Sequence, residues 1–383
     1  MYRFYLNKVG FFILIFLLAG ISLLAQNSIK LKYENSGVYA GIDIGAKGVK
    51  LSMLEIGKNG LKTGSFSVLK DTAVNTDFIS FNPSSFQATL NGLTGLYNSA
   101  LNDYKIPASH IYTVISSGVK IQADKEDKVS WITQLISAFR SAVSEPSRDM
   151  PIIDVKEEAR LSHLGIVPES RRFSTFLIDI GSGNTKGGFF PTGNIKEFKL
   201  FQLTWGTKST ANSTEKRCTE DKTISNYKKQ LERVLWGAEN AEIIYAVNES
   251  GAYPMSDNIA FSGGIAWSVA NLLYPELIDN AVVPVTYEEL EKFTEKLYNN
   301  YAGISDSAIT KTISDTSLNI EAIAKEVKRV NKVFDQRSLM AGAGLLLKIM
   351  RQFAGVYEKK QFFLVKNGQV GWISAYVDRS INN

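Results

Sequence analysis

A four-residue segment that occurs twice, Ile-Asp-Ile-Gly, constrains the fold of this chain more than any other feature. It spans residues 42–45 and again residues 178–181. The two aspartates, Asp43 and Asp179, are 136 positions apart (179 minus 43), and a lysine follows each by seven positions, at Lys50 and Lys186. A repeat at this distance is too long for a solenoid unit and matches the size of a domain. The sequence therefore predicts a duplicated domain.

Each copy closes an apolar segment and leads through a short turn into another. Residues 38–44 and 49–56 are predicted strands around a turn at 46–48, and residues 176–180 and 185–190 are strands around a turn at 181–184. Such pairs are typical of β-hairpins. Glycine lets a turn approach a ligand closely, and the exposed amides can bind an anion. The aspartate at each strand end is a ligand type that suits magnesium, so the pair indicates a phosphate site or, alternatively, two structural hairpins.

A third glycine turn follows later in the chain. Residues 258–261 are a predicted strand, Ser262, Gly263 and Gly264 form the turn, and residues 265–273 are a predicted helix. A turn that leads into a helix N-terminus presents free amide groups and the positive end of the helix dipole. We expect this turn either to contact the same ligand or to be an ordinary helix start.

The rest of the chain fits two α/β domains with a cleft between them. A length of 383 residues suggests roughly two domains, and we place them at 38–170 and 171–355. Helices are expected at 93–104, 130–144, 157–164 (ending at Gly165), 340–353 and over most of 207–240 and 286–335. A strand is expected at 110–115, and a short strand or an entry segment at 151–155. Residues 57–87 are polar and rich in turns. Residues 356–383 are predicted to form C-terminal strands, at 361–377.

Composition excludes several kinds of chemistry. Two histidines and one cysteine rule out disulfide frameworks and thiolate or imidazole zinc sites, and they argue against Ser-His-Asp hydrolysis. The net charge of +5 suits an anionic ligand, but the charge is not concentrated as in a nucleic-acid-binding domain. We therefore expect no nucleic-acid partner. Oxygen ligands and lysines remain for any reaction, and the sequence leaves a homodimer open.

The N-terminal segment differs from the rest. Arg3 and Lys8 precede an apolar run over residues 11–25. A charged start followed by about fifteen apolar residues is typical of a secretory signal, whereas a membrane span needs about twenty. Residues 1–27 are therefore predicted to be a signal peptide, with an anchor over residues 9–25 as the alternative. Either way we expect a periplasmic or secreted protein that contacts a membrane only through this segment.

The order of these elements resembles the actin, sugar-kinase and heat-shock-chaperone ATPase superfamily, and most closely the exopolyphosphatase / guanosine pentaphosphate phosphohydrolase (Ppx/GppA) family. The segment Lys-Glu-Glu-Ala-Arg-Leu-Ser-His-Leu-Gly at 156–165 resembles that family's E-E-A-R-L-x-x-x-G. Residues 116–120 resemble its T-S-A-L-R, and residues 340–346 its late A-G-A-L-I-L helix. The resemblance covers roughly residues 38–355 and implies two ribonuclease-H-like domains that bind phosphates between them.

The resemblance implies hydrolysis of phosphoanhydride bonds with Mg²⁺ or another divalent cation. Polyphosphate or another phosphorylated anion would be the substrate. Glu158 matches the second glutamate of E-E-A-R, which the family uses in catalysis. Asp179 matches its metal-linked aspartate and Asp43 the aspartate of its first loop, and both are expected to hold the metal. The expected phosphate-binding residues belong to the three glycine turns, the 116–120 segment and nearby lysines: Gly45, Ala46, Lys47, Lys50, Ser117, Lys120, Gly181, Ser182, Gly183, Asn184, Thr185, Lys186, Lys208, Ser262, Gly263 and Gly264.

The chain also departs from the family pattern. Lys186 stands where the family has a second catalytic glutamate, and a cation cannot act as a general base at neutral pH unless its pKa falls by several units. Lys120 replaces an arginine and loses the bidentate fork. Three hypotheses therefore stay open: an exported phosphohydrolase, a catalytically silent relative that binds an anion or a protein in the cleft, and an ATP-using kinase or ATPase. Export argues against the third.

Overall fold

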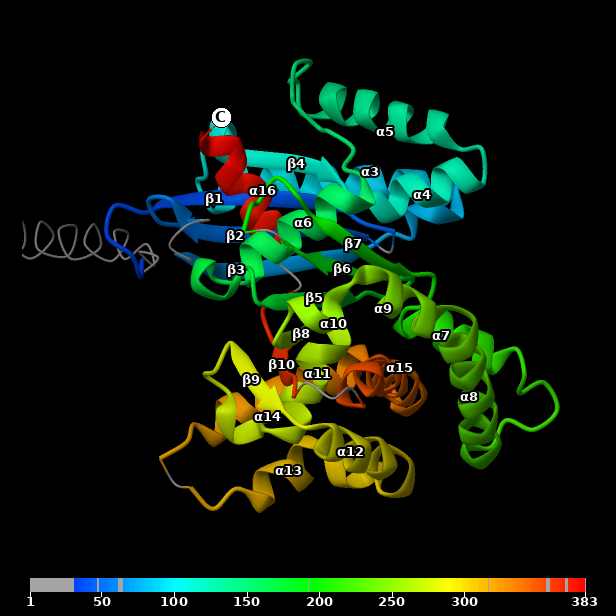
Figure 1. The fold of residues 1–383 in the computed structure, drawn as a ribbon. Coiled ribbons are helices and arrows are strands. Elements are labelled where there is room, and N and C mark those ends of the chain that lie inside the picture. Colours follow the sequence, from blue (N-terminus) through cyan, green and yellow to red (C-terminus); the bar gives the residue numbers. More distant parts are fainter. Residues whose placement is uncertain are drawn as a thin grey trace, which may run out of the picture.

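The computed structural model describes residues 31–46, 48–60, 65–191, 193–315, 317–355, 359–368 and 371–382. These residues form two α/β domains, each built on its own sheet (Figure 1). The predicted signal peptide, residues 1–27, lies outside them. In the described part of the chain, no helix combines the length and apolar character needed to span a bilayer. The predicted domain boundaries, 38–170 and 171–355, stay predictions.

The first sheet has the strand order β3-β2-β1-β4. Its strands are β1 (Gly37–Ile44), β2 (Gly48–Ile56), β3 (Phe66–Asn75) and β4 (Ile111–Ile115). The hairpin of β1 and β2 is antiparallel, and β4 lies parallel to β1. A bridge between Ile115 and Ile152 extends the sheet at the predicted 151–155 segment. The helices of this domain are α3 (Pro83–Asn98), α4 (Ser117–Lys125) and α5 (Val129–Ala142), and Leu93 and Phe139 on them are fully buried.

The second sheet has the strand order β7-β6-β5-β8-β10-β9. Its strands are β5 (Thr175–Ile180), β6 (Thr185–Phe189), β7 (Lys199–Leu203), β8 (Asn258–Ser262), β9 (Val282–Val285) and β10 (Gln361–Val365). One hydrophobic core joins this sheet to its helices, among them α7 (Thr207–Glu215), α8 (Ile224–Ala238), α11 (Gly264–Leu273), α12 (Tyr287–Asn299), α14 (Ile320–Val333) and α15 (Gln336–Ala354). The smaller helices are α9 (Ile244–Ser250), α10 (Ala252–Met255) and α13 (Asp306–Thr312).

Two helices lie together where the domains meet: α6 (Val155–Ile166) and α16 (Gly371–Asn382), the red C-terminal helix of Figure 1. Their apolar side chains share one core with Leu54 of β2 and with Phe190 and Phe198 of the second domain. The chain thus returns at its end to pack against β1 and β2.

The structure of α6 and α16 corrects two predictions. Residues 361–377 were expected to be strands, but only β10 is one; α16 is a helix. The prediction that Gly165 ends the helix before it is also wrong, because α6 continues to Ile166. A Cβ atom on Gly165 would lie 2.0 Å from the carbonyl oxygen of Gly371. Gly165 is therefore the point of close approach between α6 and α16.

Candidate functional site

The two hairpins place their aspartate and lysine in the same way. In the register of β1 and β2, Asp43 lies opposite Lys50, and in that of β5 and β6, Asp179 lies opposite Lys186. The seven-residue spacing in the sequence is therefore a cross-strand pair in each hairpin. The charges of Glu158 and Lys186 act on both aspartates. The two hairpins thus meet in one electrostatic neighbourhood, as the duplicated sequence predicts.

Glu158 lies at the centre of this neighbourhood. It is in the first turn of α6, whose N-cap Asp154 accepts a hydrogen bond from the amide of Glu157. Its side chain is only 4% exposed; Oε1 lies 2.6 Å from Nζ of Lys186, and Oε2 accepts a hydrogen bond of 2.9 Å from the amide of Ser117. Burial raises the pKa of Glu158, but Lys186 and Ser117 outweigh it, and the net pKa is lowered. Both carboxylate oxygens are therefore engaged, and the group is a weak base.

Lys186 is the cation that this arrangement encloses. Its side chain is 13% exposed. Burial alone lowers the pKa of Lys186, but Glu158, Asp179 and Asp43 together raise it above the ordinary value. The ammonium group therefore stays charged and compensates part of the negative charge of three carboxylates.

Asp43 has a strongly perturbed carboxyl group. Its Oδ1 atom is enclosed and has no hydrogen-bond partner among the described residues. Burial, followed by the charge of Glu158, raises the pKa of Asp43 from 3.8 to about 7, although Lys50 and Lys186 act in the opposite direction. A buried carboxylate oxygen without a donor is a position where a cation would be favourable.

Asp179 is held by the third glycine turn. Oγ of Ser262 donates a hydrogen bond of 3.0 Å to its Oδ1 atom. Burial raises the pKa of Asp179, and Lys186 only partly offsets this. Gly263 has a φ of +94°, and a Cβ atom there would lie 2.3 Å from the carbonyl oxygen of Ile180. The start of α11 therefore lies directly against the second aspartate bend, where glycine is required.

The second bend keeps part of its anion-binding capacity. The amide of Gly181 is used within the turn, donating to the carbonyl of Asn184, and the carbonyls of Gly181 and Ser182 accept from the first amides of α7. The amides of Ser182, Gly183 and Asn184 have no hydrogen-bond partner in the described part of the chain. Three amide donors therefore remain at this bend for an anion.

The first bend is tighter. The amides of Gly45 and Gly48 bond to each other's carbonyl groups across the turn, at 2.9 and 3.3 Å. Ala46 between them is half-buried, and Lys47 lies outside the described residues. Both glycine amides of this bend are therefore used in hydrogen bonds within the hairpin.

Some of the predicted site residues have other partners or lie at the surface. Lys120 is exposed and pairs with Asp124 on its own helix at 2.7 Å. Thr185 is buried and its hydroxyl donates to the carbonyl of Trp205. Lys208 is exposed at the start of α7, and Gly264 is the first residue of α11. The predicted residues that the structure brings together are therefore Asp43, Lys50, Ser117, Glu158, Asp179, Lys186, Ser262 and Gly263.

An ion-pair cluster beside the site was missed from the sequence. Asp71 of β3 lies 3.4 Å from Nζ of Lys50 and 3.7 Å from a guanidinium nitrogen of Arg329 on α14. The guanidinium of Arg329 also stacks over Trp267, at 5.1 Å from the ring centroid. Asp71 and Arg329 line a cavity of about 590 Å³ between the domains. No sequence pattern marks this contact, because its members are far apart in the chain and on different domains.

The described side chains alone offer too few ligands for a divalent cation, so phosphate oxygens of a bound substrate would have to complete its coordination. Among the described residues, no group of three or more carboxylate, histidine or cysteine side chains could hold a metal. The enclosed Oδ1 of Asp43 and the raised pKa of both aspartates nevertheless favour a cation there. Mg²⁺ is commonly bound by one or two carboxylates, waters and substrate phosphates. Asp43 and Asp179 fit that kind of site.

The fold and the three glycine turns define a two-domain α/β protein. More particularly, the chain has the fold of the Ppx/GppA phosphatases. It is similar to a Ppx/GppA family member from Aquifex aeolicus (16% identity, TM-score 0.59, 91% of this chain and 98% of that one). It is also similar to an exopolyphosphatase from Cytophaga hutchinsonii (13%, TM-score 0.52, 90% and 98%). No family model and no curated protein matches the chain. The predicted fold is therefore confirmed.

Proposed function

We propose that the protein binds polyphosphate or a related phosphoanhydride in the cleft between its domains, and that it has lost most of the hydrolysis its fold would support. The observation that carries this proposal is the buried ion pair of Lys186 and Glu158, 2.6 Å apart. It occupies the carboxylate that would otherwise orient and deprotonate water.

The other parts of the site suit a phosphate chain. The amides of Ser182, Gly183 and Asn184 are donors without a partner among the described residues. Lys208 is exposed beside them, and α11 directs its N-terminus at the same bend. Asp43 and Asp179 would hold a divalent cation, which when bound neutralises charge on the phosphate oxygens.

The ion pair of Lys186 and Glu158 explains why we expect little hydrolysis. A general base needs a free oxygen within hydrogen-bond reach of the attacking water and a pKa near the working pH. One oxygen of Glu158 faces Lys186, the other accepts from Ser117, and its pKa is lowered. Glu158 therefore holds Lys186 and the first turn of α4 in place instead of moving a proton.

Hydrolysis of the terminal phosphoanhydride bond is the second candidate, and Asp43 is the observation that favours it. Its pKa of about 7 suits a general base at neutral pH. In this reaction Asp179 alone would hold the cation, water would attack the terminal phosphorus, Asp43 would accept a proton from that water, and the bond to the bridging oxygen would break. Orthophosphate and a shorter chain would be the products.

One experiment separates the two candidates. The purified full-length protein is titrated with tripolyphosphate and Mg²⁺ by calorimetry, and orthophosphate is measured in the same samples. We expect binding without sustained release. Release that Asp43→Asn abolishes while binding of tripolyphosphate and Mg²⁺ is retained would establish the second candidate, and the absence of any binding would refute both.

A matched pair of lysine variants sharpens the test. Lys186→Glu restores a carboxylate to the second hairpin and should raise orthophosphate release above the wild type. Lys120→Glu makes the same charge change on the exposed face of α4 and should leave release unchanged. Equal behaviour of the two variants would contradict the role given to Lys186.

We also propose that the protein is exported through residues 1–27. The support is the charged start and the apolar run of the sequence. Fractionation of cells that express the full-length chain should place it outside the cytoplasm. A change of Leu14 and Leu17 to aspartate should retain it inside, and cytoplasmic wild-type protein would contradict export.

A further inference from the structure

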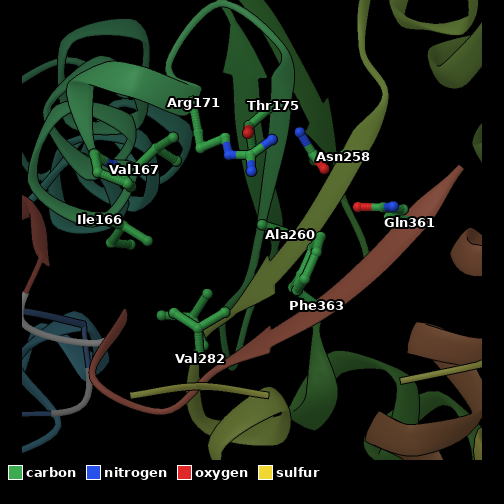
Figure 2. Close-up of a pocket in the computed structure, with 11 residues that line it drawn as sticks. Ile166, Val167, Arg171, Thr175, Asn258, Ala260, Val282, Gln361 and Phe363 are labelled. Atoms are coloured by element: carbon green, nitrogen blue, oxygen red, sulfur yellow. The ribbon is translucent and has the colours of Figure 1, made fainter. Parts of the chain in front are cut away.

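A second cavity lies away from the aspartate hairpins, on the sheet of the second domain (Figure 2). It has a volume of about 240 Å³. Its floor consists of side chains from β5, β8 and β10, and its rim consists of the end of α6 and the connection that follows it. None of the residues predicted to bind phosphate lines it.

Arg171 supplies the charge of this cavity. It is the charged residue of the lining, and its guanidinium has no hydrogen-bond or ion-pair partner among the described residues. Figure 2 shows its side chain extending over the sheet toward Thr175 and Asn258. The amide nitrogen of Asn258 donates to Ser174, so its oxygen and the hydroxyl of Thr175 remain as polar groups beside the guanidinium. A guanidinium next to a hydroxyl is suited to a carboxylate, which it can bind through two parallel hydrogen bonds.

The rest of the lining is apolar. Val167 at the rim and Ala260 on the floor are buried, and Phe363 and Val282 lie beside them. Most cavities that hold drug-sized ligands measure roughly 300–1,000 Å³, so this one suits a smaller molecule. The apolar floor excludes a fully hydrated anion such as phosphate as the best ligand, because an anion would leave that surface uncovered.

We propose that this cavity is a binding site for a small amphipathic monocarboxylate, a short-chain fatty acid or a similar apolar acid. The carboxylate binds the guanidinium of Arg171 and the hydroxyl of Thr175. The hydrocarbon chain lies on Val167, Ala260 and Phe363. This site does not depend on the function proposed for the cleft.

The cavity lies beside the segment that connects the two domains. Residues 166–171 lead from α6, which packs between the domains, into β5 of the second domain. Ile166, Val282 and Val365 line this cavity and also the larger cavity between the domains that contains Asp71 and Arg329. A bound acid therefore touches the connection between the two domains.

Hexanoate is the probe that tests the proposal. The full-length protein is titrated with sodium hexanoate by ligand-observed NMR, with sodium chloride at the same ionic strength as the blank. We expect saturable binding, and weaker binding of hexanol by about tenfold or more, since a hydrogen bond between charged groups is worth more than one between neutral groups. Equal affinity for hexanoate and hexanol, or no saturable binding of hexanoate, would overturn the proposal.

Two variants locate the ligand. Arg171→Gln should weaken hexanoate binding by about tenfold or more and leave hexanol unchanged. Arg233→Gln removes an exposed arginine on α8 and is the matched control, with unchanged affinity expected. Ala260→Leu fills the floor and should weaken both ligands, with circular dichroism to confirm that the variant is folded. Unchanged hexanoate binding in Arg171→Gln would contradict the assignment, whatever Ala260→Leu does.

Discussion

The two aspartate hairpins are the same local structure in two different surroundings. In the first, Lys50 pairs with Asp71, which also pairs with Arg329, and the Oδ1 atom of Asp43 is left without a donor in the described part of the chain. In the second, Lys186 turns toward Glu158, and Asp179 accepts from Ser262. The cross-strand pairing is the same in both, so elements outside the hairpins set the chemistry of each.

The difference shows that the two hairpins share one local structure, whereas the elements packed around them differ. The second hairpin lies against α6 and β8, which supply a buried glutamate and a serine hydroxyl. The first lies beside the edge strand β3, which supplies a carboxylate that is 20% exposed. Lys186 therefore pairs with a carboxylate that is only 4% exposed, whereas the carboxylate that pairs with Lys50 is 20% exposed. Substitutions in the two hairpins test this contrast.

The largest effect is expected from Lys186→Met. Removing one partner of a buried ion pair leaves the other charge uncompensated and costs about 3–5 kcal/mol, so the free energy of unfolding in urea should fall by that order. Lys50→Met is the matched change in the first hairpin and should cost about 1 kcal/mol or less. Adding Glu158→Gln to Lys186→Met should recover part of the loss. Equal losses from the two lysine variants would contradict the contrast.

A smaller, pH-dependent effect is expected from Asp43. Its pKa rises from 3.8 to about 7 on folding, so the native state holds this proton more tightly than the unfolded state. The stabilisation is complete below pH 4 and is lost as pH rises through 7; it amounts to about 4 kcal/mol at most. Urea unfolding of wild type and Asp43→Asn across this range measures it. The difference between them should change with pH in the absence of Mg²⁺, and a constant difference would refute the assignment.

Ser262→Ala should have a moderate effect. It removes the hydroxyl that donates to Asp179 and leaves the buried carboxyl with one donor fewer. A loss of about 1 kcal/mol in the free energy of unfolding is expected, as for one hydrogen bond. Ser268→Ala on the helix that follows, whose hydroxyl donates to a helix carbonyl, is the control. It should cost less at pH 7 than Ser262→Ala, and the reverse order would be inconsistent with a role in holding Asp179.

The smallest effect is expected from Asp71→Asn. Asp71 joins Lys50 to Arg329 through partly exposed contacts, and such pairs contribute about 0–1 kcal/mol. The stability difference from wild type should shrink as sodium chloride is added, because salt screens exposed pairs. A large difference that is insensitive to salt would show that this contact resembles the second hairpin after all.

The sequence predicted the parts of the fold that carry strong local patterns. Both hairpins, the third glycine turn and the helices α5, α11 and α15 lie where the apolar spacing and glycines place them. The strand β3 was missed because it is an edge strand with mostly exposed or half-buried residues, so the 57–87 region is polar. The α16 segment is rich in aromatic and β-branched residues, and its packing on α6 at Gly165 and Gly371, which local pattern does not encode, makes it a helix.

The candidate site was predictable only in part. The repeat identified Asp43, Asp179 and Lys186, and the family resemblance identified Glu158. The pairing of Glu158 with Lys186 required the structure, because it depends on how α6 meets β6. Lys120 shows the converse: its position in a family segment suggested phosphate binding, but it pairs with Asp124 one helical turn away.

A crystal structure of the protein grown with Mg²⁺ and tripolyphosphate tests the central claim most directly. We expect density for an intact phosphate chain between residues 43–50 and 179–186, with the cation on Asp43 and Asp179 and with Lys186 still paired with Glu158. Orthophosphate alone in that position, with Glu158 released from Lys186 and turned toward a water, would contradict it.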